Sequence, residues 1–336
     1  MKSFLFTVLF LSLSAALLVG FFFLSLTVPS HGIRENVEVK VERGESFYSV
    51  VRKLKDKGVI PNEGLFTFWA RLRTLDKKIH WGLYRFQLPM APQEVLDQMI
   101  LGRGVFHRIT IPEGFTLNEI AELLERQGLA GRKEFLSEVG DPETLSMSNL
   151  EGKGVEGYLF PDTYHFPSSA SERDILIAMV EQFRRKFGPD MDRQAIKLGL
   201  SRHEVVTLAS LVEKETGVAG ERPLIAAVFH NRLQSGIRLQ SDPTVIYGLK
   251  DFKGNLTRKD LKSASPYNTY RIHGLPPGPI CNPGLPSIRA ALYPASVPDL
   301  YFVSKNDGTH FFSTTIREHN RAVNIYQRGR RRPPRG

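Results

Sequence analysis

Two glutamates on one predicted helix are the clearest candidates for acid–base chemistry in this chain. A helix over Arg202–Thr216 is predicted by apolar residues at helical spacing: Val205, Val206, Leu208, Ala209, Leu211 and Val212. Near its end, Glu213 and Glu215 lie towards opposite edges of the apolar arc, separated by about 200° of helix rotation, so they cannot form one carboxylate pair. Apolar walls raise the pKa of a carboxyl, which suits a general acid; the alternative is a helix-end carboxylate in a surface ion pair.

Three clusters of polar and aromatic residues, held by glycine and proline, surround this helix in the sequence. They span residues 156–164, then 208–216 with 231–233 and 238–248, then 265–270 with 274–278 and 282–284. Aromatic faces and amide or hydroxyl groups are the chemistry that binds neutral sugars. The clusters therefore favour a carbohydrate site that includes Asn231, Gln240, Tyr267, Asn268 and Tyr270. The alternative is that these loops are well-capped turns without a binding role.

Several other chemistries are disfavoured by the sequence. It contains no H-E-x-x-H motif and its nine histidines are scattered, so a metalloprotease is disfavoured and no metal site is expected. Ser210 and Lys214 are four residues apart, where S-x-x-K requires three, and no G-x-S-x-G or phosphate-binding glycine motif occurs. Cys281 is the only cysteine, which excludes an intramolecular disulfide. No cofactor is implied.

Two similar strand–turn–helix units lie in the first half of the chain. In the first, Val37–Glu42 alternates as a half-buried strand, Ser46 is a plausible N-cap, and a helix over Phe47–Lys57 ends at Gly58. The same pattern recurs seventy residues on, with strand, N-cap, helix and terminal glycine at Arg108–Ile111, Thr116, Leu117–Arg126 and Gly128. We interpret the pair as an internal repeat; the alternative is that any two such units look alike.

The predicted elements indicate an α+β fold in two parts. Between the repeat units, Gly82–Phe86 is a predicted strand and Pro92–Leu101 a predicted helix, so residues 33–105 are expected to form one small α+β module. Beyond it, residues 106–325 are dense in glycine, proline and aromatics and are expected to form a larger mixed α+β domain. Residues 326–336 are rich in arginine and are predicted to be a disordered tail.

The N-terminus predicts the compartment. An apolar run from Phe4 to Val28 contains no charge and is long enough to cross about 30 Å of hydrocarbon, so residues 1–32 are interpreted as a transmembrane signal anchor and linker. A cleaved signal peptide is the alternative, but the small residues Ser14-Ala15-Ala16 fall inside the run and not after it. Lys2 on the short side predicts a cytoplasmic N-terminus, with the rest of the chain outside.

Net charge limits the partners without choosing among them. The formal net charge of +10 suits a polyanionic neighbour, whether nucleic acid, an anionic membrane face or a cell-wall polymer. Nucleic-acid binding conflicts with the predicted external compartment, so no nucleic-acid partner is expected.

The stretches described above resemble one family, the endolytic murein transglycosylases of the MltG or YceG-like type. The most specific match is Leu239–Gly248. The other matching stretches are residues 156–164, 209–216, 266–270 with 274–278, and 301–303 with Phe311 and His319-Asn320. Together with the anchor and the strand Gly82–Phe86, the resemblance covers nearly the whole chain, and only the arginine-rich tail departs from it.

This resemblance implies a membrane-proximal LysM-like module at residues 33–105 and a catalytic domain that cuts within nascent peptidoglycan strands at the inner membrane. Cleavage between MurNAc and GlcNAc would leave 1,6-anhydroMurNAc ends and terminate glycan elongation. The resemblance selects Glu215 as the essential acid, and its matching stretches add Ser241, Asp242, Tyr247 and Thr269 to the candidate substrate-binding residues. Penicillin-binding proteins or other wall synthesis proteins are candidate partners.

Two other functions remain open from the sequence. A non-catalytic peptidoglycan-binding scaffold of the wall synthesis machinery would show the same composition. A true hydrolase would usually need a second carboxylate to activate water or to attack the sugar. A lytic transglycosylase can work with one carboxyl group, because the attacking C6 hydroxyl belongs to the substrate.

Overall fold

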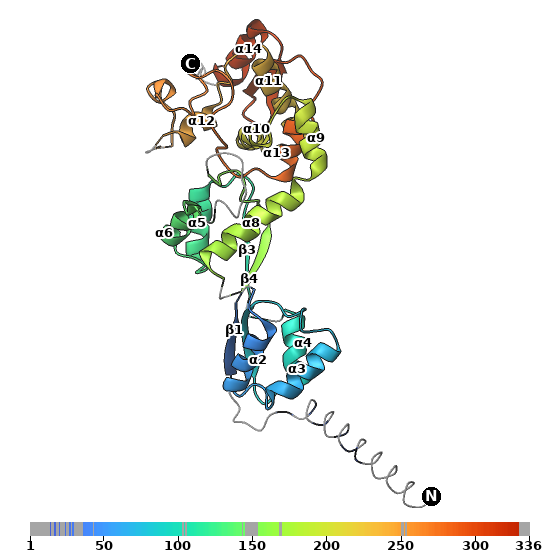
Figure 1. Ribbon diagram of the computed structural model, residues 1–336. Helices are drawn as coiled ribbons and strands as arrows, with labels where there is room; N and C mark the ends of the chain where they lie inside the picture. The colour runs from blue at the N-terminus through green and yellow to red at the C-terminus, as the bar shows by residue number, and fades with distance from the viewer. Residues whose placement is uncertain are drawn as a thin grey trace, which may run out of the picture. The chain divides into compact units, whose positions relative to one another are not determined.

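The structure, a computed structural model, describes the chain from residue 36 to residue 328 (Figure 1). Within that range it leaves out residues 43, 103, 105, 143, 145–153, 168–169, 250–251 and 253, and before it only positions 14, 17, 20, 24, 27 and 29 are described. Most of the predicted anchor, and the tail from residue 329 on, therefore lie outside the described residues. Among the residues that are described, no helix has the length and apolarity needed to cross a membrane.

The chain has a mixed α+β fold and divides into two compact units. One unit contains Met1–Arg108 and His165–Ala170, and the other contains Ile109–Tyr164 and Ser171–Gly336. The sheets of the described part are small: three two-stranded pairs, β1 with β2, β3 with β4, and β5 with β6. The predicted α+β class is confirmed, and helices supply most of the packing surfaces.

The first unit is a two-stranded antiparallel sheet covered by helices. Its elements are β1 (Asn36–Val41), α2 (Phe47–Asp56), α3 (Glu63–Leu72), β2 (Gly82–Gln87) and α4 (Pro92–Ile100). Val39 of β1 is paired with Tyr84 of β2, and both are fully buried, as the alternating pattern of β1 predicts. The buried tyrosine donates its hydroxyl hydrogen to the backbone oxygen of His80 at 2.7 Å, so its polar end is satisfied inside the core.

The second unit is larger and mostly helical. The strands β3 (Phe106–Thr110) and β4 (Thr163–Pro167) each have residues in both units. The other elements of the second unit are α5 (Leu117–Arg126), α6 (Arg132–Val139), α8 (Glu172–Lys186), α9 (Pro189–Lys197), α10 (Arg202–Glu215), η1 (Ala219–Glu221), α11 (Arg222–Gln234), α12 (Asp242–Tyr247), η2 (Asp260–Lys262), α13 (Leu285–Leu292), β5 (Tyr301–Ser304), β6 (His310–Ser313), α14 (Ile316–Val323) and η3 (Asn324–Arg328). In Figure 1, α10 lies at the centre of this unit with α9, α11 and α13 around it.

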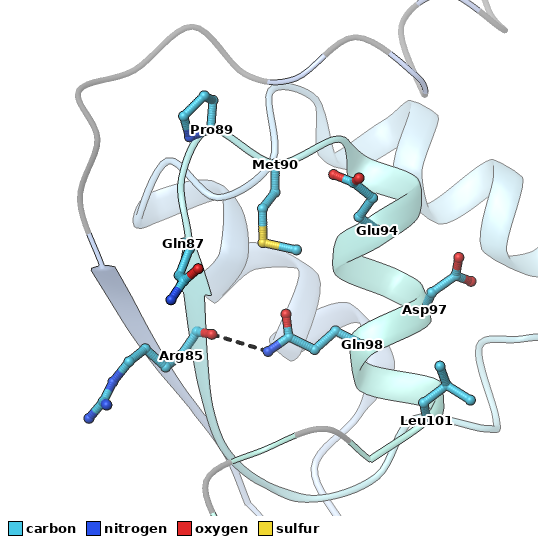
Figure 2. Close-up of a pocket in the computed structure, with 8 residues that line it drawn as sticks. All are labelled: Arg85, Gln87, Pro89, Met90, Glu94, Asp97, Gln98 and Leu101. Carbon is cyan, nitrogen blue, oxygen red and sulfur yellow. Dashed lines mark hydrogen bonds between the residues drawn. The ribbon is translucent and has the colours of Figure 1, made fainter.

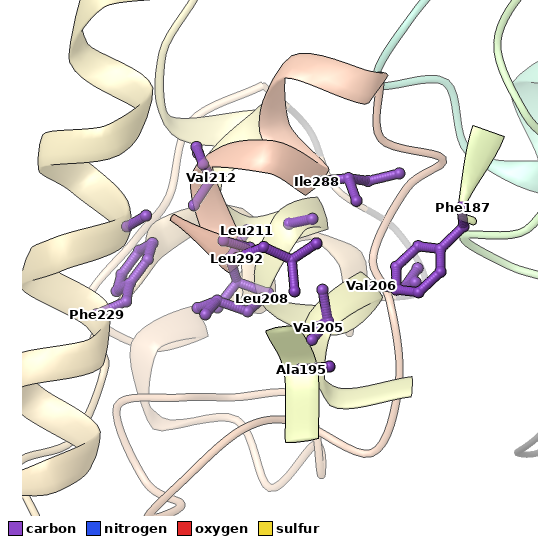
Figure 3. Close-up of a cluster of buried hydrophobic side chains, with 14 of the residues drawn as sticks. Phe187, Ala195, Val205, Val206, Leu208, Leu211, Val212, Phe229, Ile288 and Leu292 are labelled. Carbon is purple, nitrogen blue, oxygen red and sulfur yellow. The ribbon is translucent and has the colours of Figure 1, made fainter. Parts of the chain in front are cut away.

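Helix α10 is buried on every side, which the sequence pattern did not predict. The sequence gives it one apolar arc, but all residues from Val205 to Val212 are buried, including Thr207 and Ser210. Leu208 and Leu211 pack among apolar residues of α11, α13 and the segments before α10, as Figure 3 shows. The two buried hydroxyls are satisfied locally: Thr207 donates to the His203 carbonyl, and Ser210 donates to the Thr207 carbonyl. The helix is therefore held in place by packing on all of its faces between Val205 and Val212.

The repeated strand–turn–helix unit is present in both places. Ser46 caps α2 and Thr116 caps α5, each accepting a hydrogen bond from a backbone N–H of the first turn. The glycines of both copies have left-handed φ angles: Gly44 (77°), Gly58 (71°), Gly114 (78°) and Gly128 (67°). This conformation is what glycine supplies at a turn and after a helix C-terminus, so the matching positions carry matching backbone.

Candidate active site

Glu215 lines a cavity of about 430 Å³ in the second unit. It is the last residue of α10, so the central helix of the unit ends at this cavity. The side chain is half-buried, and among the described residues it forms no ion pair, which argues against the surface-pair alternative. The other residues around the cavity come from α11, the loop before α12 and the start of α12, the loop after η2, the β5–β6 hairpin and the C-terminal helices: Arg232, Leu239, Gln240, Asp242, Tyr270, Phe302, Val303, Ser304, His310, His319, Val323 and Gln327.

A buried hydroxyl network fixes the Glu215 carboxyl. The Ser241 hydroxyl donates to Glu215 Oε1 at 2.5 Å. Ser241 is itself held, because its backbone N–H donates to Thr269 Oγ1 at 2.9 Å and its carbonyl accepts from Thr244 Oγ1 at 2.6 Å. The two threonine hydroxyls are 2.8 Å apart, and all three hydroxyl residues are buried. A satisfied network of this kind is rigid, so it sets the direction in which Glu215 points.

The surroundings of Glu215 raise its pKa to about 7. Burial is the largest cause, since removing water disfavours the charged carboxylate, and the nearby negative charge of Asp242 acts in the same direction. The hydrogen bond from Ser241 and the positive charge of Arg232 act in the opposite direction but do not cancel the effect of burial. A carboxyl with this pKa can hold a proton at neutral pH and can also release it.

Arg232 is a structural cation beside the cavity. Its guanidinium donates to the backbone carbonyls of Leu300 at 2.7 Å and Leu239 at 2.7 Å, and it lies over the ring of Tyr301 with 5.2 Å between Cζ and the ring centroid. These contacts tie α11 to the loop before α12 and to β5. The same charge limits how far the pKa of Glu215 rises.

Glu213 occupies a different environment from Glu215, as the helical rotation predicts. Its carboxylate accepts a hydrogen bond from the backbone N–H of Gly284 at 2.9 Å and lies 3.5 Å from the Arg222 guanidinium. Arg222 also donates to the Ser287 hydroxyl at 3.1 Å. Glu213 therefore connects α10 to the start of α13 and to α11, and it does not line the cavity of Glu215.

The predicted substrate-binding residues fall into three groups. Gln240, Asp242 and Tyr270 line the cavity, and the Tyr270 hydroxyl donates to Asp242 Oδ1 at 2.6 Å. Ser241 and Thr269 lie directly behind Glu215 and position it, as described above. The remaining four residues, which are Asn231, Tyr247, Tyr267 and Asn268, are not part of the cavity lining.

Those four residues have contacts that organise loops. The Asn231 amide donates to the carbonyls of Val297 and Asp299, and the Asn268 amide donates to the carbonyls of Leu261 and Ser263. Asn268 is fully buried, so its side chain closes a turn. Tyr247 and Tyr267 pack against each other with ring centroids 4.8 Å apart.

Glu156 is a second buried carboxyl with a pKa raised to about 7. Burial is the main cause, although the carboxyl accepts hydrogen bonds from the backbone N–H of Leu117, the Tyr247 hydroxyl and the Asn282 amide. Neither Glu156 nor these partners line the cavity. The group joins the start of α5 to α12 and the loop before α13, which is a structural arrangement.

The C-terminal wall of the cavity was not among the predicted site residues, although residues 301–303 and His319 were among the stretches that match the family. Among the predicted site residues none comes from β5, β6, α14 or η3, yet Phe302, His310 and His319 line the cavity. The aromatic and β-branched residues on both sides of Asn306-Asp307-Gly308 are a hairpin signal that would have predicted β5 and β6. No spacing rule would have brought this hairpin to the end of α10, because that contact joins segments about a hundred residues apart.

Another hollow lies in the first unit, between β2 and α4 (Figure 2). It measures about 770 Å³, and Gln98 on its wall donates to the Arg85 carbonyl at 3.1 Å. Of its two carboxylates, Glu94 accepts from the Ala91 N–H and so caps α4, and Asp97 lies on the same helix. Across the described part of the chain, no group of three or more His, Cys, Asp or Glu side chains is arranged to hold a metal ion.

Comparison with known proteins identifies the family. The model of the YceG-like family matches residues 39–325, which is most of the chain, and the chain therefore belongs to the YceG-like family. A YceG-like protein of Listeria monocytogenes, solved by crystallography, is 34% identical, with a TM-score of 0.58 over 85% of this chain and 98% of that one.

Curated relatives carry one common name. A protein of Bacillus subtilis named endolytic murein transglycosylase is 33% identical over 311 residues, covering 87% of this chain and 85% of the relative. A protein of the same name from Streptococcus pneumoniae serotype 2 is 28% identical over 322 residues, and the match covers 86% of this chain but 58% of that relative.

We expect the substitution Glu215→Gln to stabilise the protein at alkaline pH relative to acidic pH. The folded protein raises the pKa of Glu215 from an ordinary 4.5 to about 7, so its stabilising contribution is complete below pH 4.5 and is lost as pH rises through 7. Glutamine cannot ionise and avoids this loss. From pH 5 to pH 8, urea unfolding should show the variant gaining roughly 1–3 kcal/mol relative to the wild type. An equal difference at both pH values would contradict the raised pKa.

Proposed function

We propose that this protein is an endolytic murein transglycosylase, a lyase that cuts the MurNAc–GlcNAc bond within nascent peptidoglycan strands. The observation that carries the proposal is Glu215, a half-buried carboxyl with a pKa of about 7, aimed by Ser241 into a cavity at the end of the central helix. Membership of the YceG-like family and the shared name of its curated relatives support the same activity. The products are strands with 1,6-anhydroMurNAc ends, and cleavage terminates glycan elongation.

The chemistry needs one carboxyl acting twice. Protonated Glu215 donates its proton to the glycosidic oxygen as the bond from MurNAc C1 breaks. The resulting carboxylate then accepts the proton of the MurNAc C6 hydroxyl, whose oxygen closes on C1 to form the anhydro ring. Glu215 ends the cycle protonated, so no water is consumed and no second carboxylate is required. The nucleophile is held close because it belongs to the same sugar.

The residues around Glu215 divide into positioning and binding roles. Ser241, Thr244 and Thr269 aim the carboxyl, and Ser241 also moderates its pKa. Gln240, Asp242 and Tyr270 present amide, carboxylate and phenol groups at the cavity, which suit the hydroxyl and acetamido groups of sugars. Asn231, Tyr247, Tyr267 and Asn268 contribute by holding the loops that carry these groups.

The rest of the chain serves to place this site near the membrane. Residues 1–32 anchor the protein in the inner membrane by a single helix with a cytoplasmic N-terminus, as the uncharged run Phe4–Val28 indicates. Residues 33–105 act as a LysM-like module, residues 106–325 as the catalytic domain and residues 326–336 as a basic tail. Penicillin-binding proteins or other wall synthesis proteins are the partners whose nascent strands the enzyme would release.

Product analysis separates this activity from its two rivals. A non-catalytic wall-binding scaffold yields no soluble fragments from purified peptidoglycan. A hydrolase yields reducing MurNAc ends, because water and not the C6 hydroxyl attacks C1. The proposed lyase yields anhydroMurNAc ends, which are lighter by one water and are distinguished by mass spectrometry.

The substitution Glu215→Gln should abolish anhydro product, with a loss of at least about 10²–10⁴-fold in kcat, because the amide has no transferable proton. Glu213→Gln is the matched control on the same helix, since it removes a carboxylate that faces Arg222 and Gly284 instead of the cavity. It should keep most of the activity and lose thermal stability. Mass spectrometry of digests and melting curves measure the two effects. An active Glu215→Gln enzyme beside an inactive Glu213→Gln enzyme would contradict the assignment.

Topology is tested by a reporter fused after Gly336. Alkaline phosphatase, which is active only outside the cytoplasm, should be active in this fusion, and a cytoplasmic reporter such as β-galactosidase should be inactive. The reason is the long uncharged run that follows Lys2. The opposite pair of activities would show that the catalytic domain is cytoplasmic and would exclude access to peptidoglycan.

A further inference from the structure

A carboxylate–imidazole pair on the C-terminal side of the cavity has no role in the mechanism above. Glu221 of η1 accepts a hydrogen bond from the backbone N–H of His310 through Oε1 at 2.8 Å. Its other oxygen, Oε2, lies 2.7 Å from Nδ1 of the same histidine. One carboxylate therefore holds both the main chain and the ring of a single residue, although the two residues are 89 positions apart in the sequence.

This double contact fixes the hydrogen-bonding character of the ring. Burial alone would raise the pKa of Glu221, but hydrogen bonds from His310 outweigh burial and hold that pKa below its ordinary value. Glu221 is therefore a carboxylate at neutral pH and can only accept, so Nδ1 of His310 must carry hydrogen and donate. In the neutral ring, Nε2 is then an unprotonated acceptor.

The same ring lines the cavity that Glu215 also lines. His310 lines the cavity, and its ring packs at right angles to Phe302 with 5.5 Å between centroids, and against Phe312 with 6.4 Å between centroids. The side chain is 12% exposed, so protein surrounds most of the ring, and His310 is one of the residues that line the cavity. Among the described residues, Glu221 is the one hydrogen-bond partner of this imidazole.

We propose that the β5–β6 hairpin forms an aminosugar subsite of the cavity, in which His310 Nε2 accepts a hydrogen bond from a hydroxyl or acetamido N–H of the glycan and Glu221 sets the tautomer that makes this possible. His310 is then a substrate-binding residue and Glu221 a positioning residue. The inference rests on the proposed function, because it takes the ligand to be a peptidoglycan strand.

The arrangement suits a neutral sugar donor better than an anion. Neutral Nε2 with a lone pair repels a carboxylate or phosphate oxygen, and the arginine of the cavity lining, Arg232, already donates to backbone carbonyls. Hydroxyl and acetamido N–H groups are the donors that every GlcNAc and MurNAc ring offers. A fixed acceptor beside aromatic side chains is the kind of group that orients a ring without charge pairing.

The test uses two variants that separate binding from structural support. His310→Ala removes the acceptor and the contact with Glu221 together. Glu221→Gln keeps the shape and both contacts with His310: its oxygen still accepts from the His310 backbone N–H, but its NH₂ must donate to Nδ1. The Thr216 hydroxyl, which donates to Oε2 of Glu221 at 3.4 Å, must instead accept from that NH₂. The neutral ring then carries its hydrogen on Nε2, which becomes a donor. The tie between η1 and β6 survives in this variant while the acceptor is lost.

Binding is measured in full-length protein carrying Glu215→Gln, with soluble uncrosslinked peptidoglycan strands as the probe, at pH 8. Both variants should raise the dissociation constant about 3–10-fold, as expected for the loss of one neutral hydrogen bond. The double variant should bind no more weakly than His310→Ala alone. Asp307→Asn, at the exposed tip of the same hairpin, is the control and should bind as tightly as the protein that carries Glu215→Gln alone. Melting temperatures of Glu221→Gln and the parent should agree closely.

The outcomes separate this inference from the proposed function. Unchanged binding in Glu221→Gln would overturn the subsite, even if His310→Ala is unstable, because the tautomer is then irrelevant to the glycan. Weaker binding in Glu221→Gln with an intact fold supports it. The proposed function is tested apart from this, by anhydro product from protein with Glu215 intact; absence of product there, with glycan binding still sensitive to Glu221→Gln, would overturn the lyase and leave the subsite standing.

Discussion

The site depends on one constraint: a carboxyl must stay protonated near neutral pH without being buried out of reach. Glu215 meets it by ending a helix whose residues from Val205 to Val212 are all buried, and by lining a cavity at the end of that helix. Burial raises the pKa, while Ser241 and Arg232 keep the rise to about 7. A higher value would weaken the carboxylate as the base of the second step, and a lower one would remove the acid of the first.

The surrounding fold can be understood as what holds the end of α10 in place. Glu213 ties the helix to α11 and α13 on one side, and the Ser241–Thr269–Thr244 network closes over the other side. The contacts of Glu213 with Gly284, of Glu215 with Ser241 and of Ser241 with Thr269 join residues far apart in the chain, so the site depends on tertiary contacts within the second unit. This explains why many polar residues of the sequence clusters, such as Asn268, hold loops and do not touch the cavity.

Sequence patterns predicted the parts with local rules and missed those set by tertiary contacts. The caps at Ser46 and Thr116, and the helix of Glu215, follow from capping and periodicity and are present as predicted. The full burial of α10 could not be predicted, because it depends on segments distant in the sequence, such as Ile280, whose backbone N–H donates to the buried Ser210 hydroxyl. The wall carrying His310 was missed for the same reason, since no local pattern records which hairpin meets which helix end.

Direct titration of the Glu215 carboxyl tests the central claim most closely. With ¹³C label at glutamate Cδ, the difference between spectra of the wild type and the Glu215→Gln variant isolates this carboxyl from Glu156, which also titrates near neutrality. Following its chemical shift from pH 4 to pH 9 gives the midpoint. The account predicts a midpoint of about 7. A midpoint near 4.5, the ordinary value for glutamate, would contradict it, because Glu215 would then be ionised at neutral pH and unable to donate a proton.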